Sequence, residues 1–594
     1  MNASFISRYV FLNLFWHAKL WIFIEILNMS SQDHWGKWHV VMRFPIHRSE
    51  IWISLQCDPN FTAVYLFSFY QLRIKDIFVL LEGAILRPDL LSNGVMKKNY
   101  EKLMIIICLA VMTTTGMMGQ GVRQPLSEEQ KQLNVMHQVI TSEKLFQYVE
   151  RLSDPVLEGR LAGSPGMAKA VRIVEDYYRD WGLKPAGDKG SYIQEYPHPC
   201  VEIQPGSMME VLFPIKAKEK DTWIAKSYPW AEGWFAGGMS GNGDITADVV
   251  YAGFGVTAPE LGYDDYKGID VRGKIVLVEG ETPNRSREPE DIAKWYNHTL
   301  HQTKLNNAVA HGAIGLLYKW VPGPNAPYNK DFVYCHVTDT VVDDLFRGTG
   351  RTYRETVDKI YETMKPQSFD MGKRARIKMN ATYNPDATGK NIVGVVEGSD
   401  PVLKNEYVII AAHLDHLGMI PYHIEGANDN NASTAALLGA AEAIARLETK
   451  PKRSVVFLSL DGEEAGLTGS TYYTNHPIFP KEKVKAVLNL EQVGAGEILV
   501  SNYAYDHPAL AKMAEAANGK YIHRQLIQRE NHYLTRPRTD GAVFMKAGYP
   551  CVDLRAAGGG YYHHPKDNTQ SINPEILESV GQWLFWTAIG LANE

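Results

Sequence analysis

Polar side chains that could bind a cation follow the ends of three apolar segments. EYVIIAAHLDHLG (406–418) contains His413 and Asp415, SVVFLSLDGEE (454–464) ends in Glu463 and Glu464, and KAVLNLE (485–491) ends in Glu491. Two adjacent carboxylates at the end of a buried strand repel each other and are costly to desolvate. A bound cation offsets both effects, so the Glu463–Glu464 pair predicts a metal ion.

Two loop segments carry further residues of the same kind. GANDNNAS (426–433) places Asp429 just before a helix that Ser433 or Asn431 could cap. GYPCVDLRAAGGGYYHHPKDN (548–568) leaves an apolar strand for a glycine-rich loop that carries Tyr562 and His563. Ligands of open α/β sheets bind outside the carboxyl ends of the strands. We therefore expect all of these side chains on one rim of a sheet.

The donor types indicate which metal and which chemistry this rim would support. Nitrogen and oxygen ligands without thiolate suit zinc, and less often manganese or cobalt. Two metal ions would need a bridging carboxylate, and they would hold both the attacking and the departing atoms of a hydrolysis. One carboxylate must stay off the metals as a general base. The adjacent glutamates fit this division, with one as ligand and the other as base. Each motif alone is more often a surface feature, and their joint occurrence at successive strand ends carries the prediction.

The elements that must position these residues can be read from hydrophobic patterns. From Asn391 onward, continuous apolar runs alternate with amphipathic helical segments, which is typical of a sheet buried on both faces. The predicted class is therefore α/β. Residues 205–385 contain short β-rich runs interrupted by glycine and indicate an inserted β-rich domain. After the turn-rich GRLAGSPG loop (159–166), a helix is predicted from apolar residues at spacings of 4, 3, 4 and 3, namely Met167, Val171, Val174, Tyr178 and Trp181.

Four segments together resemble the signatures of a known family. HLDHLG, GANDNNAS, DGEEAGLTGS and YYHHPKDN resemble the co-catalytic zinc exopeptidases of metallopeptidase family twenty-eight. That family includes bacterial leucyl aminopeptidases, glutamate carboxypeptidase and glutaminyl cyclase. The resemblance extends from about Glu128 to the C-terminus, and it implies a three-layer α/β/α domain with a mixed, mostly parallel sheet. VVYAGFGV, YKGIDVRGKIVLVEG and AHGAIGLLY resemble the protease-associated domain that is often inserted in such enzymes.

The resemblance also implies a role for each site residue. His413 would bind the first metal, Asp429 would bridge, and Glu464 and His563 would bind the second metal. Glu491 stands where the family usually has an aspartate as the remaining ligand of the first metal. Three further residues match positions that act beside the metals. Glu463 matches the general base, and Asp415 matches the carboxylate that orients the first histidine. Tyr562 matches a residue that stabilises the oxyanion.

Some residues depart from the family pattern or compete with the assigned ligands. RTDGAVF (538–544) resembles a segment usually written Ser-Asp-His, so Thr539 and Gly541 are departures in the region of the substrate pocket. Alignment on the following Pro565 and Asp567 favours His563 over His564 as the ligand. Two further histidines near the motifs are not expected to be ligands, namely His416 and His423.

The pattern of a secretory signal peptide begins at Met96. Two lysines precede the ten-residue apolar run 103–112, which small residues follow, and such a run is too short to span a membrane. We therefore expect residues 96–119 to be a signal peptide and residues 1–95 to be a misassigned upstream extension. The alternative is a membrane-associated extension, although none of its runs reaches the roughly 18 charge-free apolar residues of a span. In the mature chain, residues 120–204 and 386–594 would form the peptidase domain. Residues 205–385 would be inserted between these two parts.

Composition excludes some classes of partner and of scaffold. The formal charge of −6 and the lack of a long basic run argue against a nucleic-acid partner. The mature chain would keep Cys200, Cys335 and Cys551, which are too few for a disulfide scaffold. Pairing of Cys200 with Cys335 stays open.

The expected function is that of an exported aminopeptidase with two zinc ions, which acts on peptides in the periplasm or outside the cell. Three alternatives remain open: a glutamate-type carboxypeptidase or dipeptidase, a glutaminyl cyclase, and a binding protein with an inactive site. The cyclases use one zinc, so the complete set of two-metal ligands argues against that alternative. The preferred terminal residue and the oligomeric state also stay open.

Overall fold

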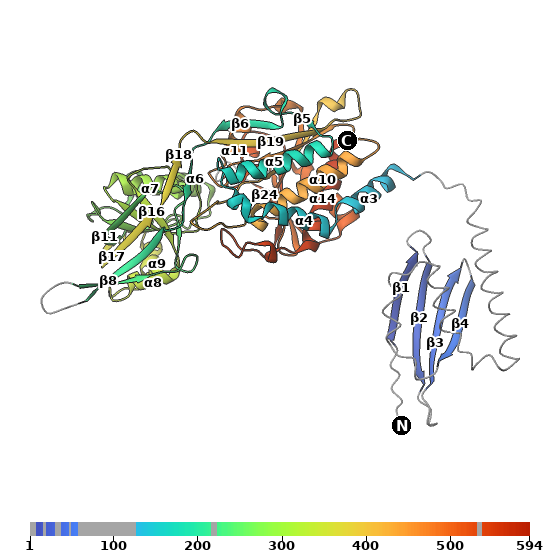
Figure 1. The fold of residues 1–594 in the computed structure, drawn as a ribbon, viewed down its shortest axis with the longest axis horizontal. Coiled ribbons are helices and arrows are strands. Elements are labelled where there is room, and N and C mark those ends of the chain that lie inside the picture. Colours follow the sequence, from blue (N-terminus) through green and yellow to red (C-terminus); the bar gives the residue numbers. More distant parts are fainter. Residues whose placement is uncertain are drawn as a thin grey trace. The chain divides into compact units, whose positions relative to one another are not determined.

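The computed structural model describes residues 8–15, 20–29, 37–46, 49–57, 126–215, 222–531 and 537–594. The chain divides into two compact units, Met1–Pro125 and Leu126–Glu594 (Figure 1). The described part of the first unit is an antiparallel sheet of four strands in sequence order, β1 (Arg8–Phe15), β2 (Leu20–Met29), β3 (Lys37–Ile46) and β4 (Ser49–Cys57). The predicted signal peptide, residues 96–119, lies outside the described residues. Within the described ranges, no helix has both the length and the apolar character needed to cross a membrane.

A mixed sheet forms the centre of the second unit. Its strands run in the order β24 (Leu526–Asn531), β23 (Ile498–Ala504), β25 (Cys551–Ala557), β22 (Val484–Glu491), β20 (Tyr407–His413), β21 (Ser454–Leu460), β19 (Thr388–Val396) and β5 (Lys184–Pro185), with β6 (Ile193–Pro197) also beside β19. The four central strands, from β25 to β21, are parallel. Strand β19 is antiparallel to β21, and β23 is antiparallel to β25. The predicted mixed sheet is confirmed, with its parallel part at the centre.

Helices cover both faces of this sheet, which confirms the three-layer α/β/α arrangement. Strand β20 shows how the sequence produces it, because Val408 and Ile410 enter one core while Ile409 and Ala411 enter the other. The first core is closed mainly by α3 (Glu128–Val139), α4 (Ser142–Leu152), α5 (Pro165–Asp180), α10 (Ala432–Arg446), α12 (Pro508–Ala517) and α14 (Pro574–Asn593). The second core is closed by α11 (Thr468–Asn475) and α13 (Asp540–Lys546).

Helix α5 matches the predicted apolar spacing. Ser164 caps its first turn by accepting a hydrogen bond from the backbone N–H of Met167, and Pro165 occupies the first turn. The predicted face from Met167 to Tyr178 is buried, while Trp181 is the C-terminal cap. The helix therefore packs on the central sheet through the residues that the spacing selected.

Residues 208–379, called the inserted domain here, form a second sheet within the same unit. The strand order is β10 (Trp234–Ala236), β16 (Val333–Val337), β15 (Gly315–Lys319), β14 (Ile275–Glu279), β11 (Gly243–Tyr251), β17 (Phe369–Met379), β8 (Met208–Ile215) and β9 (Thr222–Ser227). Strands β11, β14, β15 and β16 are parallel. Its helices are α6 (Pro289–Thr299), α7 (His301–Ala310), α8 (Asp339–Phe346) and α9 (Tyr353–Thr363). These bounds lie within the predicted 205–385, and identity with a protease-associated domain stays a prediction.

The inserted domain packs against the loop that follows β20. Leu417, Ile420 and Ile424 of this loop are buried in the core of the inserted domain. The indole N–H of Trp230 donates to the Ile420 carbonyl at 2.5 Å. Because the same loop begins at the predicted ligand His413, the inserted domain is anchored directly beside the site. The cysteines predicted to remain in the mature chain are buried and free, so Cys200 and Cys335 are not paired.

Candidate metal centre

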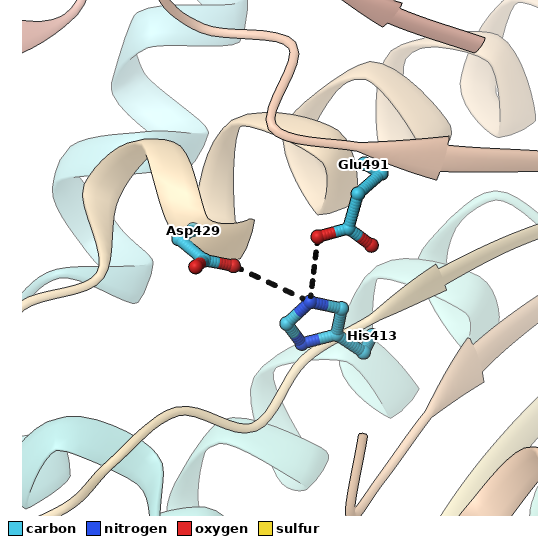
Figure 2. A group of neighbouring side chains, drawn as sticks. All are labelled: His413, Asp429 and Glu491. Atoms are coloured by element: carbon cyan, nitrogen blue, oxygen red, sulfur yellow. Dashed lines mark ion pairs between the residues drawn. The ribbon is translucent and has the colours of Figure 1, made fainter. Parts of the chain in front are cut away.

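The first predicted group of ligands assembles at the carboxyl ends of two parallel strands. His413 is the last residue of β20, Glu491 is the last residue of β22, and Asp429 belongs to the short helical turn η8 (Ala427–Asn431). The His413 Nε2 atom lies 3.5 Å from Asp429 Oδ1 and 3.6 Å from Glu491 Oε1 (Figure 2). All three side chains are buried, and their potential ligand atoms lie within 4.8 Å of one another. The strand-end argument therefore places these three residues together.

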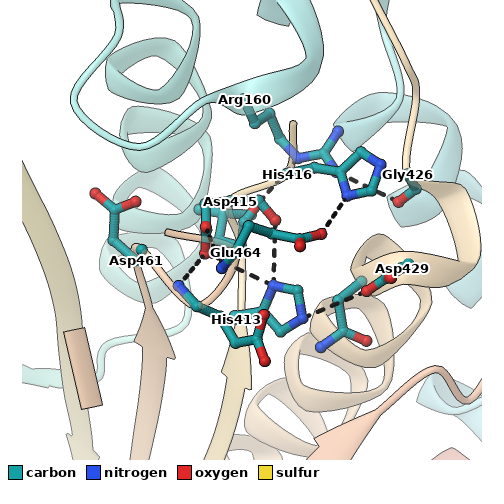
Figure 3. A network of polar contacts seen from close by, with 12 residues as sticks. Arg160, His413, Asp415, His416, Gly426, Asp429, Asp461 and Glu464 are labelled. Atoms are coloured by element: carbon teal, nitrogen blue, oxygen red, sulfur yellow. Dashed lines mark hydrogen bonds and ion pairs between the residues drawn. The ribbon is translucent and has the colours of Figure 1, made fainter. Parts of the chain in front are cut away.

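The second group shares Asp429 with the first. His563 Nε2 lies 2.9 Å from Glu464 Oε2 and 3.5 Å from Asp429 Oδ2. The two oxygens of Asp429 thus face two different histidines, His413 and His563, as a bridging carboxylate would require. His416 also enters this group, because its Nδ1 lies 2.8 Å from Glu464 Oε1 (Figure 3). Its position was not anticipated from the sequence, although the HLDHLG motif contains it.

The chemistry of these atoms fits metal ions. His413 Nε2, His563 Nε2 and Glu491 Oε2 are buried and make no well-directed hydrogen bond. Buried polar atoms without a partner are costly, and native proteins rarely retain them without a ligand, ion or water. Potential ligand atoms converge in two groups, one of His413, Asp429 and Glu491 and one of His416, Asp429 and Glu464. His563 Nε2 lies beside the second group, 2.9 Å from Glu464 Oε2. Nitrogen and oxygen donors at these positions suit zinc, with Asp429 between the two groups.

Electrostatic interactions in the centre reflect a concentration of negative charge. Burial alone would lower the pKa of His413, but the carboxylates of Glu491 and Glu463 hold it well above its ordinary value. Burial likewise opposes protonation of His563, and Glu464 nevertheless raises its pKa to about 9. Burial would raise the pKa of Glu464, and His563 with His416 brings it well below the usual range. The buried carboxylates of the centre thus favour a nearby positive charge, as a metal site requires.

Asp415 connects the first histidine to the pair of glutamates. Its backbone carbonyl accepts a hydrogen bond from His413 Nδ1 at 3.1 Å, while its carboxylate lies 3.6 Å from the same nitrogen. The carboxylate accepts hydrogen bonds from the backbone N–H groups of Glu463 at 3.1 Å and Glu464 at 3.2 Å (Figure 3). Asp415 therefore orients the imidazole mainly through its backbone and holds the Glu463–Glu464 turn through its side chain.

The predicted general base, Glu463, differs from its neighbour in its surroundings. Its side chain is partly exposed, whereas that of Glu464 is buried. Among the described ion pairs, Glu464 contacts two histidines and Glu463 contacts none. Desolvation by the surrounding protein, although incomplete, and then the charges of Glu491 and Glu464 raise the pKa of the Glu463 carboxyl well above its ordinary value. The two carboxylates thus occupy different environments, as the division into base and ligand requires.

Tyr562 lies beside the second group rather than within it. Its ring stacks on His563 with 3.8 Å between ring centroids, and its side chain is half exposed. The departures at Thr539 and Gly541 have a local explanation. Thr539 Oγ1 donates to the carboxylate of Asp553 at 2.9 Å, and a Cβ atom at Gly541 would lie 1.6 Å from the same carboxylate. Asp553 therefore occupies the space that a larger residue at 541 would need.

Two buried residues that the sequence did not mark support the loops around the centre. Arg160 is 1% exposed and donates to four backbone carbonyls, those of Leu152, Leu414, Glu425 and Gly426. Figure 3 shows Arg160 beside Gly426. Asp567 accepts hydrogen bonds from the backbone N–H groups of Asn428 at 2.8 Å and Asp429 at 3.0 Å. The only sequence signals were a charged residue in a glycine-rich loop and an aspartate after the ligand histidine.

Residues 391–587 match the model of Peptidase family M28. This matched segment is called the M28 domain below. The segment contains all eight residues predicted for the site. The match thus agrees with the resemblance of the four motifs.

Curated relatives of the M28 domain include fungal and bacterial proteins. The chain is 29% identical over 188 residues to a vacuolar membrane protease of Lodderomyces elongisporus. This aligned segment covers 32% of this chain and 19% of that protein. It is 24% identical over 341 residues to aminopeptidase YwaD of Bacillus subtilis, covering 52% of this chain and 69% of that protein. The chain thus spans about a fifth of the length of the fungal relatives.

Solved structures share the fold of the M28 domain and of further parts of the chain. An aminopeptidase from Aneurinibacillus sp. strain AM-1 has a TM-score of 0.52 at 20% identity, covering 77% of this chain and 96% of that one. A Peptidase M28 precursor from Shewanella amazonensis has a TM-score of 0.53 at 19% identity, covering 79% of this chain and 98% of that one. At these identities the likeness concerns the fold.

The inserted domain contributes directly to the centre of the M28 domain. His563 Nδ1 donates to the backbone carbonyl of Pro322 at 2.5 Å. A hydrogen bond at Nδ1 fixes the tautomer in which Nε2 is free to bind a metal. Arg538 of the M28 domain also pairs with Glu281 of the inserted domain at 2.8 Å. The second group of ligands therefore lies where the two domains meet.

Proposed function

We propose that this chain is a zinc-dependent aminopeptidase that removes N-terminal residues from peptides with two metal ions. The observation that carries the proposal is the position of Asp429, whose two oxygens face the histidines of two separate ligand groups. A centre with a shared carboxylate suits hydrolysis of an amide bond. Aminopeptidase YwaD and the Aneurinibacillus aminopeptidase, which share the sequence family or the fold, support the choice of substrate.

The residues of the chain divide the proposed reaction between them. His413, Asp429 and Glu491 would hold one zinc ion, and Glu464, His563 and Asp429 would hold the other. Zinc in these positions would supply a Lewis acid for the scissile carbonyl and would lower the pKa of bound water. Glu463 takes the proton from the attacking water and delivers it to the leaving amine. The Tyr562 hydroxyl donates a hydrogen bond to the oxyanion, and Asp415 keeps His413 and the glutamate pair in position.

The proposal is tested with three sets of substrates. Amino-acid p-nitroanilides report cleavage after a free amino terminus, N-acetylated peptides report carboxypeptidase action, and N-terminal glutaminyl peptides report cyclisation. We expect turnover of the p-nitroanilides by the zinc-loaded chain and its loss after treatment with a chelator. Preference for N-acetylated peptides with a C-terminal glutamate would instead establish the carboxypeptidase. Cyclisation without hydrolysis would establish the cyclase, and a zinc-loaded chain inactive on all three would be a binding protein.

The proposed site of action is outside the cytoplasm, on the basis of the signal-peptide pattern at residues 96–119. The mature protein would begin close to Gln120. N-terminal sequencing of the protein recovered from the source cells tests this directly. A mature chain that retains residues before Met96 would contradict both the start site and the cleavage.

A further inference from the structure

A cavity of about 580 Å³ lies at the carboxyl ends of three parallel strands of the inserted domain. Glu279, Lys319 and Val337 are the last residues of β14, β15 and β16, and all three line it. Its wall also includes Tyr562 and His563 of the M28 domain. The strand ends of an open sheet are where α/β folds bind ligands. This cavity thus adjoins the metal centre through the ligand histidine itself.

One carboxyl group in the cavity has an unsatisfied oxygen. Glu279 is 6% exposed, and its Oε2 accepts a hydrogen bond from the Tyr353 hydroxyl at 2.7 Å. Its Oε1 is buried without a hydrogen-bond partner. Burial raises the pKa of the Glu279 carboxyl to about 7, and the hydrogen bond and nearby lysines offset this only in part. A buried acceptor of this kind is costly unless a ligand donates to it.

The cationic side chains around the cavity are already engaged. Lys319 pairs with Asp339 at 2.8 Å, and the guanidinium of Arg285 lies over the Tyr361 ring at 3.4 Å from its centroid. Lys304 Nζ donates at 2.5 Å to each of two backbone carbonyls, at positions 254 and 281. The other two acidic residues of this wall are also paired, Glu281 with Arg538 and Asp339 with Lys319. Glu279 is therefore the carboxylate with capacity for an additional cation.

The rest of the wall suits the aliphatic stem and charged end of a long side chain. Aromatic rings and apolar groups line it beside the carboxyl group, among them Phe235, Trp320, Tyr353, Tyr361 and Tyr562. Aromatic faces attract cations, and apolar walls cover the methylene groups of lysine or arginine. An apolar pocket with one well-placed charged group is the usual design of a specific binding site.

We propose that this cavity is a specificity pocket for a basic side chain of the peptide substrate, with Glu279 as the acceptor of its charge. The proposal rests on the peptidase function given above, and it names lysyl- or arginyl-containing peptides as the preferred substrates. The inserted domain would then select substrates while the M28 domain cleaves them.

The first test compares kcat/KM for matched substrates. Lysyl and arginyl p-nitroanilides are measured beside those of norleucine and leucine, and Leu-Lys and Leu-norleucine amides test the second position. At one of the two positions we expect a basic residue to be preferred by about 10- to 100-fold, the range for a hydrogen bond to a charged group. Glu279→Gln should abolish this preference, so that basic and apolar substrates give similar kcat/KM. Glu362→Gln, on the exposed face of α9, is the control that should keep it.

Binding without turnover separates this proposal from the proposed function. Calorimetry with L-lysinamide and L-norleucinamide measures the pocket even if no peptide is hydrolysed. We expect the wild type to bind lysinamide more tightly than norleucinamide, and Glu279→Gln to bind the two amides equally. Thermal melting checks that Glu279→Gln is folded. Equal binding of the two amides to the wild type, or an unchanged difference in Glu279→Gln, would overturn the pocket. If the wild type hydrolyses no peptide but still binds lysinamide more tightly than norleucinamide, only the proposed peptidase function is overturned.

Discussion

The Nδ1 atom of His563 donates a hydrogen bond to the carbonyl of Pro322, which joins a metal ligand of the M28 domain to the inserted domain. These residues lie 241 positions apart in the sequence. The bond sets the imidazole so that Nε2 faces Glu464 and Asp429. The affinity of the second metal should therefore depend on how firmly the inserted domain holds Pro322.

Pro322→Gly tests this dependence, because glycine loosens the backbone while leaving every ligand in place. Partners that orient a ligand typically contribute about 10- to 100-fold to metal affinity. We expect zinc at the second site to bind more weakly by a factor in this range, measured by chelator competition. Pro259→Gly, at an exposed position of the inserted domain, is the control. Equal zinc affinity in both variants would show that the Pro322 carbonyl has no role in binding.

Substitution of the two adjacent glutamates should affect the rate and the zinc content differently. Glu463→Gln keeps the size of the side chain but cannot accept a proton, so kcat should fall by at least the roughly 10²–10⁴-fold of general acid–base catalysis. Its zinc content should stay near that of the wild type, because Glu463 has no ion pair with the histidines. Glu464→Gln replaces an anionic ligand by an amide, so zinc content and rate should both fall. Metal analysis and kinetics of the two purified variants provide the measurement. The assignments are reversed if only Glu463→Gln loses metal.

Glu491 should bind the first metal although its side chain is one methylene longer than aspartate. Its Oε1 already lies 3.6 Å from His413 Nε2, and its Oε2 is buried without a partner. A crystal structure with zinc should therefore place a Glu491 oxygen at about 2.0–2.2 Å from the ion. Glu491→Gln should lose the first zinc ion by metal analysis. A zinc-loaded structure in which both oxygens lie well beyond that distance would refute the assignment.

The strand-end residues could be predicted because their positions follow from local pattern and topology. An apolar run that ends in His413 or Glu491 defines a strand, and parallel neighbours bring both ends to one edge. The supports could not be predicted in the same way. Arg160 reaches Gly426 across 266 positions, and Pro322 reaches His563 across 241. Such contacts are set by how the packed elements meet, which hydrophobic periodicity does not encode. The antiparallel direction of β19 and β23 is likewise set by how the packed elements meet.

His416 shows where the motif alone could not separate neighbours. It lies 2.8 Å from Glu464 Oε1, on the opposite oxygen from His563. We expect His563→Gln to lose the second zinc ion and His416→Gln to retain it with weaker binding, because His416 then only orients Glu464. Zinc titration of both variants measures the difference. If His416→Gln loses the ion and His563→Gln retains it, the two histidines exchange roles.

Arg160 should contribute strongly to stability although it lies outside the reaction. Its guanidinium is buried, and burial lowers its pKa to about 10 while carboxylates led by Asp415 oppose this shift. Arg160→Met would leave four buried carbonyls without a donor and the nearby carboxylates without a counter-charge. Removing one partner from a buried charged network costs about 3–5 kcal/mol. We expect a loss of this size in the free energy of unfolding, measured with urea.

Arg160→Lys separates the charge from the geometry of this support. Lysine keeps the positive charge but cannot reproduce the planar fork that donates to four carbonyls. We therefore expect Arg160→Lys to recover only part of the lost stability. Full recovery would mean that the charge near Asp415 matters and the four hydrogen bonds do not. A loss below about 1 kcal/mol in Arg160→Met, the range of ordinary surface substitutions and small defects, would show that water replaces the guanidinium at these carbonyls.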